Sequence, residues 1–175
     1  MDFSQTYFEL FNLPATYALD REHLDSTYRE LQSRVHPDRF VSKPETEQRV
    51  AMQWATRVNE AYQTLKHPIT RGVYMLQLLG LDPLAPTNTS IAPAFLMQQM
   101  EWREAISDAC RAKDVAMLDH LQVELKDVYH AVDAELAIAL DETQNPAVAS
   151  ESVRKLKFMD KLMAEVGDAY ESCES

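Results

Sequence analysis

The segment REHLDSTYRELQSRVHPDRF, residues 21–40, combines one amphipathic helix with the turn that ends it. Asp20, just before the segment, is of a residue type that caps helix N-termini. The proline of the tripeptide at 36–38 cannot continue a helix, so we expect this helix to end at about Val35. Its apolar face follows the helical period and consists of Leu24, Tyr28, Leu31 and Val35.

A second long helix is predicted after the tripeptide. It begins within SKPE, where Ser42 and Glu45 have the spacing of a capping box and Pro44 stands in the first turn. Two such helices joined by a loop of about six residues form an antiparallel hairpin, with the tripeptide at its tip. The inward face of the second helix is predicted to contain Val50, Trp54, Val58, Ala61, Tyr62 and Leu65.

The whole chain is predicted to be all-α. It has only 3 glycines in 175 residues, where an average usage of about 7% gives roughly 12. The stretch GLDPLAPTNTSIAP, residues 80–93, interrupts the helical pattern. We therefore expect an N-terminal module at 1–79, made of the antiparallel hairpin plus short helices, a linker at 80–92, and a C-terminal three-helix bundle at 93–175.

The acidic residues are concentrated in the second half of the chain. The net charge is −11 overall, with −1 in residues 1–79 and −10 in residues 80–175. Such a surface repels phosphate groups and attracts basic proteins, so nucleic-acid binding is not expected.

The sequence also predicts where the protein resides. No run approaches the ~18 apolar residues that cross a bilayer, and the start MDFSQTYF lacks the basic region of a signal peptide. We expect a cytoplasmic protein without membrane contact. Cys110 and Cys173 are far apart in the chain and outside any CxxC pair, which predicts neither a disulfide framework nor a cysteine zinc site.

The tripeptide His36, Pro37 and Asp38 leaves four interpretations open. An imidazole beside a carboxylate can act in acid–base catalysis, but no motif ties a nucleophile to this pair. A metal site would need further ligands, and no other histidine stands at a recognised spacing. A tight turn, or the docking tip for another protein, needs only the residues present.

The stretches YRELQSRVHPDRF and VNEAYQTLKHPITRGVY resemble a J domain, the module with which co-chaperones engage DnaK-type ATPase chaperones. The resemblance implies that His36, Pro37 and Asp38 form the loop that activates the chaperone. It also implies that basic side chains around this loop contact the chaperone, namely Arg29, Arg34 and Arg39. Glu30 stands where many J domains carry a second base, which suggests a dedicated chaperone partner.

The second half of the chain indicates which group of J-domain co-chaperones the sequence resembles. AFLMQQMEWREAI and VRKLKFMDKL resemble the HscB family of co-chaperones, and the similarity runs from YFELFNLP to the last helix. The resemblance implies a role in iron–sulfur cluster assembly, with the chaperone HscA and the cluster scaffold IscU as partners. It implies a protein that is not an enzyme and that holds no cofactor or metal of its own.

The first helix of the bundle has apolar residues outside its core face. With Phe95 at zero, Leu96, Met97 and Met100 fall at about 100°, 200° and 140° on a helical wheel. Together with the family resemblance, this predicts a scaffold-binding surface composed of Leu96, Met97, Met100, Glu101, Glu104 and Phe158. Three alternatives remain: these residues pack on a helix of the first module, the client is a different protein, or the chain is a helical metal-dependent hydrolase.

Overall fold

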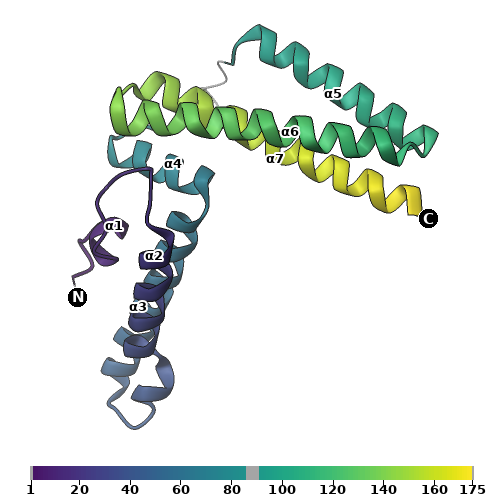
Figure 1. The fold of residues 1–175 in the computed structure, drawn as a ribbon. Helices are drawn as coiled ribbons and strands as arrows, with labels where there is room; N and C mark the ends of the chain where they lie inside the picture. Colours follow the sequence, from purple (N-terminus) through teal and green to yellow (C-terminus); the bar gives the residue numbers. More distant parts are fainter. Residues whose placement is uncertain (1, 86–90, 175) are drawn as a thin grey trace. The chain divides into compact units, whose positions relative to one another are not determined.

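The computed structural model describes residues 2–85 and 91–174, and every regular element within these ranges is a helix (Figure 1). The all-α prediction is therefore confirmed. The chain folds into two compact units, Met1–Met75 and Leu76–Ser175, and the division falls inside one helix, α4 (Pro68–Leu78). Of the linker expected at 80–92, residues 80–85 and 91–92 fall in the second unit, and residues 86–90 lie outside the described residues.

The first unit begins with two helices that have side-chain caps. The short helix α1 (Tyr7–Leu10) has a capping box between Thr6 and Glu9, and the backbone N–H of Thr6 lowers the pKa of the Glu9 carboxyl. In α2 (Arg21–Val35) the Asp20 carboxylate accepts the backbone N–H of His23, which confirms the predicted cap. A 3₁₀ turn, η1 (Pro37–Phe40), and a longer helix, α3 (Glu45–Lys66), follow.

Helices α2 and α3 form the predicted antiparallel hairpin (Figure 1). The Tyr62 hydroxyl donates to Asp25 at 3.0 Å, and the Tyr28 hydroxyl donates to Asn59 at 2.8 Å. The rings of Tyr28 and Tyr62 also stack, with centroids 3.9 Å apart. From the first pair to the second, the residue number rises on α2 and falls on α3, so the two helices are antiparallel and these contacts fix their register.

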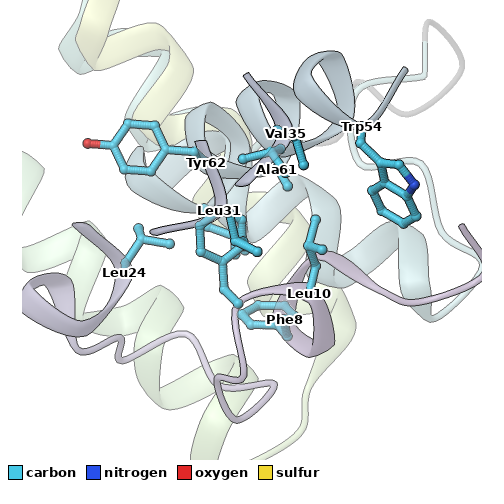
Figure 2. Packing of buried hydrophobic residues seen from close by; sticks show 11 residues of the cluster. Phe8, Leu10, Leu24, Leu31, Val35, Trp54, Ala61 and Tyr62 are labelled. Atoms are coloured by element: carbon cyan, nitrogen blue, oxygen red, sulfur yellow. The ribbon is translucent and has the colours of Figure 1, made fainter. Parts of the chain in front are cut away.

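The core of this unit lies between α1, α2 and α3. Figure 2 shows Phe8 and Leu10 of α1 facing the apolar residues of the hairpin. Leu24, Val58 and Leu65 are completely buried. Most of the predicted inward face of α3 is therefore confirmed, and this face is Trp54, Val58, Ala61, Tyr62 and Leu65.

Two predictions about the start of α3 were wrong. Ser42 does not cap the helix: Pro44 occupies the N-cap position without a side-chain hydrogen bond, and the Gln48 amide instead donates to the carbonyls of Val41 and Lys43. Val50 does not point into the core, because its side chain is 47% exposed. The pairing of Tyr28 with Asn59, extended toward the tip of the hairpin, places Val50 opposite Pro37. Pro37 lies beyond the end of α2, so that helix does not cover Val50.

The second unit contains three long helices, α5 (Pro93–Ala112), α6 (Val115–Ala137) and α7 (Pro146–Glu174), with a π turn, η2 (Ile138–Glu142), after α6. The Asp114 carboxylate accepts the backbone N–H of Met117 and so starts α6. Lys113, in the left-handed conformation at φ 52°, closes α5. None of the helices in the described ranges has both the length and the apolar character needed to cross a bilayer.

Polar contacts fix the directions of the helices in this bundle. Tyr170 donates to Asp119 at 2.6 Å, and Ser152 donates to Glu135 at 3.3 Å, so α6 and α7 are antiparallel. The Trp102 indole donates to Glu124 of α6 at 2.8 Å. The apolar core between the three helices includes Trp102, Ile106, Leu118, Leu121, Leu125, Met159, Leu162 and Val166.

Candidate functional site

The tripeptide forms a defined corner at the end of α2. His36 leaves the helix with φ −57° and ψ 127°, as expected for a residue that precedes proline. Pro37 then opens η1 at a position where its missing N–H costs no hydrogen bond. The backbone N–H of Asp38 donates to Nδ1 of His36 at 3.3 Å, which ties the imidazole to the turn.

Both polar side chains of the corner are exposed. The side chains of His36 and Asp38 are 53% and 85% exposed, and Nδ1 of the imidazole lies 3.5 Å from the carboxylate. The same nitrogen cannot accept the Asp38 N–H and donate to the carboxylate. In the neutral ring, the backbone contact leaves the hydrogen on Nε2. The corner then presents one N–H donor beside one carboxylate to a partner.

The two predicted basic contacts on α2 lie on different sides of the helix. Arg29 and Arg34 are both exposed, but five residues along a helix separate them by about 140°. Arg34 makes no ion pair within the described residues. The Arg39 guanidinium donates to the Ser33 carbonyl at 2.9 Å, in the last turn of α2. Arg39 therefore also braces the corner against the helix that precedes it.

Among the described residues, the corner lacks the further ligands that a metal site requires. Within 2–85 and 91–174, no group of three or more His, Cys, Asp or Glu side chains is placed to hold a metal ion. His23 lies on α2, where its ring contacts the Phe11 carbonyl at 3.3 Å. In the described part of the chain, His36 and Asp38 thus form a pair without a third ligand for the metal-dependent hydrolase alternative.

Helix α5 exposes the apolar residues that the wheel placed outside the core. Leu96, Met97 and Met100 are 43%, 64% and 72% exposed. Glu101 and Glu104 are exposed as well, so the five residues cover an arc of about 140° on one side of the helix. The opposite side holds Trp102, Ile106 and Ala109, which are 4–5% exposed.

Phe158 of α7 lies at the same level of the bundle as this arc. The Lys155 ammonium is 6.0 Å from the Phe95 ring centroid, and Arg103 pairs with Glu165 at 3.3 Å. Because both contacts join α5 to α7 in the same order, these two helices are parallel. Phe158, which is partly buried, lies between the two contacts, and its ring centroid is 5.9 Å from Nζ of Lys161.

The charges around the exposed methionines are mainly acidic on α5. A carboxylate oxygen of Glu101 accepts the Gln98 amide at 3.0 Å, while Glu104 makes no ion pair within the described residues. An apolar strip beside exposed carboxylates fits a protein surface that combines apolar and basic side chains.

Comparisons with known proteins relate the whole chain to one group. Residues 91–167 match the family model described as the HSCB C-terminal oligomerisation domain. The Co-chaperone protein HscB homolog of Burkholderia thailandensis is 52% identical, over 97% of this chain and 96% of that protein. The solved chaperone HscB from Vibrio cholerae has a TM-score of 0.85 and 36% identity, with 95% and 98% of the two chains covered. Human co-chaperone protein HscB has a TM-score of 0.89 and 26% identity, with 95% and 83% covered.

Proposed function

We infer the function from the family: this chain belongs to the HscB family of co-chaperones, and we propose that it brings the scaffold protein IscU to the DnaK-type chaperone HscA during iron–sulfur cluster assembly. In this proposal the protein is not itself an enzyme. It stimulates ATP hydrolysis by the chaperone and supplies the chaperone with its client.

The chaperone-binding end is the corner at the tip of the hairpin. His36 and Asp38 are both exposed, and the backbone N–H of Asp38 holds the His36 imidazole, so a partner can bind the corner without first ordering the loop. Arg29 and Arg34 add exposed guanidinium groups, which pair with carboxylates in a fixed geometry. Arg39 has two roles here, because it braces the corner and is itself exposed to the partner.

The scaffold-binding end is the exposed strip of α5 together with Phe158. The observation that carries this assignment is that Met97 and Met100 are 64% and 72% exposed, although the core of the bundle is filled without them. Methionine side chains adapt to the shape of a partner and contribute apolar contact area. Leu96 and Phe158 extend that area, and Glu101 and Glu104 favour a partner with basic residues.

Joining the two ends in one chain has a kinetic consequence. A scaffold protein bound to the second unit is held near the chaperone bound to the first unit. Its effective concentration at the chaperone rises without any new contact. The protein then accelerates a reaction that requires both partners while changing neither of them chemically.

A second candidate function is self-association. It is favoured by the description of the matching family model as an oligomerisation domain. The strip around Met97 and Met100 could bind a second copy of the chain instead of the scaffold. Sedimentation velocity with and without IscU separates the two, because a self-associating strip forms dimers that Met100→Ala weakens even when no scaffold is present.

The main test is steady-state ATP hydrolysis by HscA, with and without IscU. We expect the wild-type protein to stimulate hydrolysis and IscU to increase the effect. His36→Gln should abolish stimulation while leaving IscU binding and the thermal midpoint unchanged, because the side chain is exposed. His67→Gln is the matched control, since it changes an exposed histidine of the same unit away from the tip. Full stimulation by His36→Gln, or none by wild type, would contradict the proposal.

A further inference from the structure

A groove lies beside the tip of the hairpin and within the first unit. It opens between the last turn of α2, η1 and the first turns of α3. Its volume is about 390 Å³, which falls within the ~300–1,000 Å³ typical of ligand pockets. The groove can therefore accept at least one large side chain.

The groove is apolar inside. Its floor consists of Val35, Ala51 and Trp54, which belong to the hairpin and are 4–6% exposed. Its walls are Phe40, which is partly buried, and Val50, which is 47% exposed. In the described part of the chain no helix covers Val50, because α3 continues toward the tip beyond the point where α2 ends. An apolar recess with a polar edge is typical of a protein-binding site.

The groove has one acidic and one basic residue at its edge, and they differ in whether the protein already provides a group that stabilises the charge. Glu47 stands in the first turn of α3, where the helix N-terminus stabilises a carboxylate. Arg34 lines the groove from the other helix, α2. Its guanidinium makes no ion pair within the described residues. A partner side chain with a carboxylate would complete this edge by a charge-assisted hydrogen bond.

We propose that this groove is a second docking point for the DnaK-type chaperone, and that it receives an apolar side chain of the chaperone with a carboxylate within reach of Arg34. The inference rests on the function proposed above, because that function assigns the tip to the chaperone. Val35 directly precedes His36, and Phe40 follows Asp38 by two residues. A protein surface seated on the corner therefore extends over the adjoining groove.

The two contacts have separable effects. The corner acts on the hydrolysis step through His36 and Asp38, whereas the groove adds only binding area. Losing the groove contact raises the concentration of co-chaperone needed for half-maximal stimulation and leaves the maximal rate unchanged. Losing the corner lowers the maximal rate itself.

The experiment titrates wild type, Val50→Gln and Met52→Gln into HscA and ATP. Gln forms helices at least as well as Val, and Val50 is half exposed, so the fold is preserved. We expect Val50→Gln to raise the half-maximal concentration about tenfold, equivalent to about 1.4 kcal/mol. Met52→Gln is the control on the same helix: Met52 is 60% exposed and does not line the groove, so its curve should match wild type.

The outcomes separate this inference from the proposed function. If Val50→Gln titrates like wild type while His36→Gln loses stimulation, the groove is not a docking point and the proposed function stands. Equal weakening by Met52→Gln also overturns the inference, since the effect is then general to α3. If wild type sediments as a dimer that Val50→Gln dissociates, the groove binds a second copy instead. A wild type that never stimulates HscA overturns both proposals.

Discussion

Truncation of the two exposed methionines of α5 should weaken scaffold binding without weakening the fold. The perturbation is the double variant Met97→Ala/Met100→Ala. Both side chains extend from the solvent side of α5, and Ala is the best helix former. The helix should therefore persist, and only the apolar area offered to the partner should decrease.

The magnitude follows from the exposed fractions. Fully burying one methionine side chain stabilises by roughly 1.5–3 kcal/mol, and 64% and 72% of these two remain available for a partner to bury. If the scaffold fully covers both side chains in the wild-type complex, removing them should weaken the binding free energy by about 2–4 kcal/mol. At about 1.4 kcal/mol for each tenfold step, the dissociation constant should rise roughly 30- to 1,000-fold.

Isothermal titration of IscU into each variant measures this loss, and urea unfolding measures the cost to the fold. Ile106→Ala is the matched control on the same helix, because Ile106 is 5% exposed. It should cost about 2–5 kcal/mol of stability and leave the affinity of the folded protein nearly unchanged. The reasoning is refuted if the methionine variant binds IscU like wild type, or if it loses as much stability as the control.

Two further predictions concern the bundle itself. The hydrogen bond to Asp119 raises the pKa of Tyr170 from 10.0 to about 12. Because the folded-state pKa is the higher one, the stabilisation by this contact is fully present below about pH 10 and is lost between about pH 10 and pH 12. Tyr170→Phe should therefore flatten the decline of the thermal midpoint over that same range, about pH 10 to pH 12. Leu125→Ala should cost about 2–5 kcal/mol in urea unfolding, since Leu125 is 0% exposed. Val123→Ala, at a 59% exposed position, should stay within about 0.5 kcal/mol, and an equal loss would contradict the assignment of the core.

The structure changes the role of one predicted residue. Arg39 was expected only as a contact for the chaperone, yet its guanidinium donates to the Ser33 carbonyl. A substitution at Arg39 would thus remove a charge and also loosen the turn that orients His36. Arg34, which lacks an ion pair among the described residues, is the better position at which to test charge alone.

Local chemistry was sufficient to predict both ends of α2. The cap at Asp20 and the proline at position 37 act within one turn of the chain, so their effect can be predicted from the sequence. The 3.6-residue period likewise predicted most of the buried face of α3, including Trp54, Val58 and Leu65. The exposure of Met97 and Met100 follows from the same periodicity.

Features that depend on the partner of a helix required the tertiary structure. Val50 continues the apolar stripe of α3, but it is exposed because α2 ends before reaching it. Likewise, Phe158 comes level with the strip of α5 only because α5 and α7 are parallel and in one particular register. Periodicity reports which side of a helix is apolar, whereas the length and register of the neighbouring helix decide whether that side is covered.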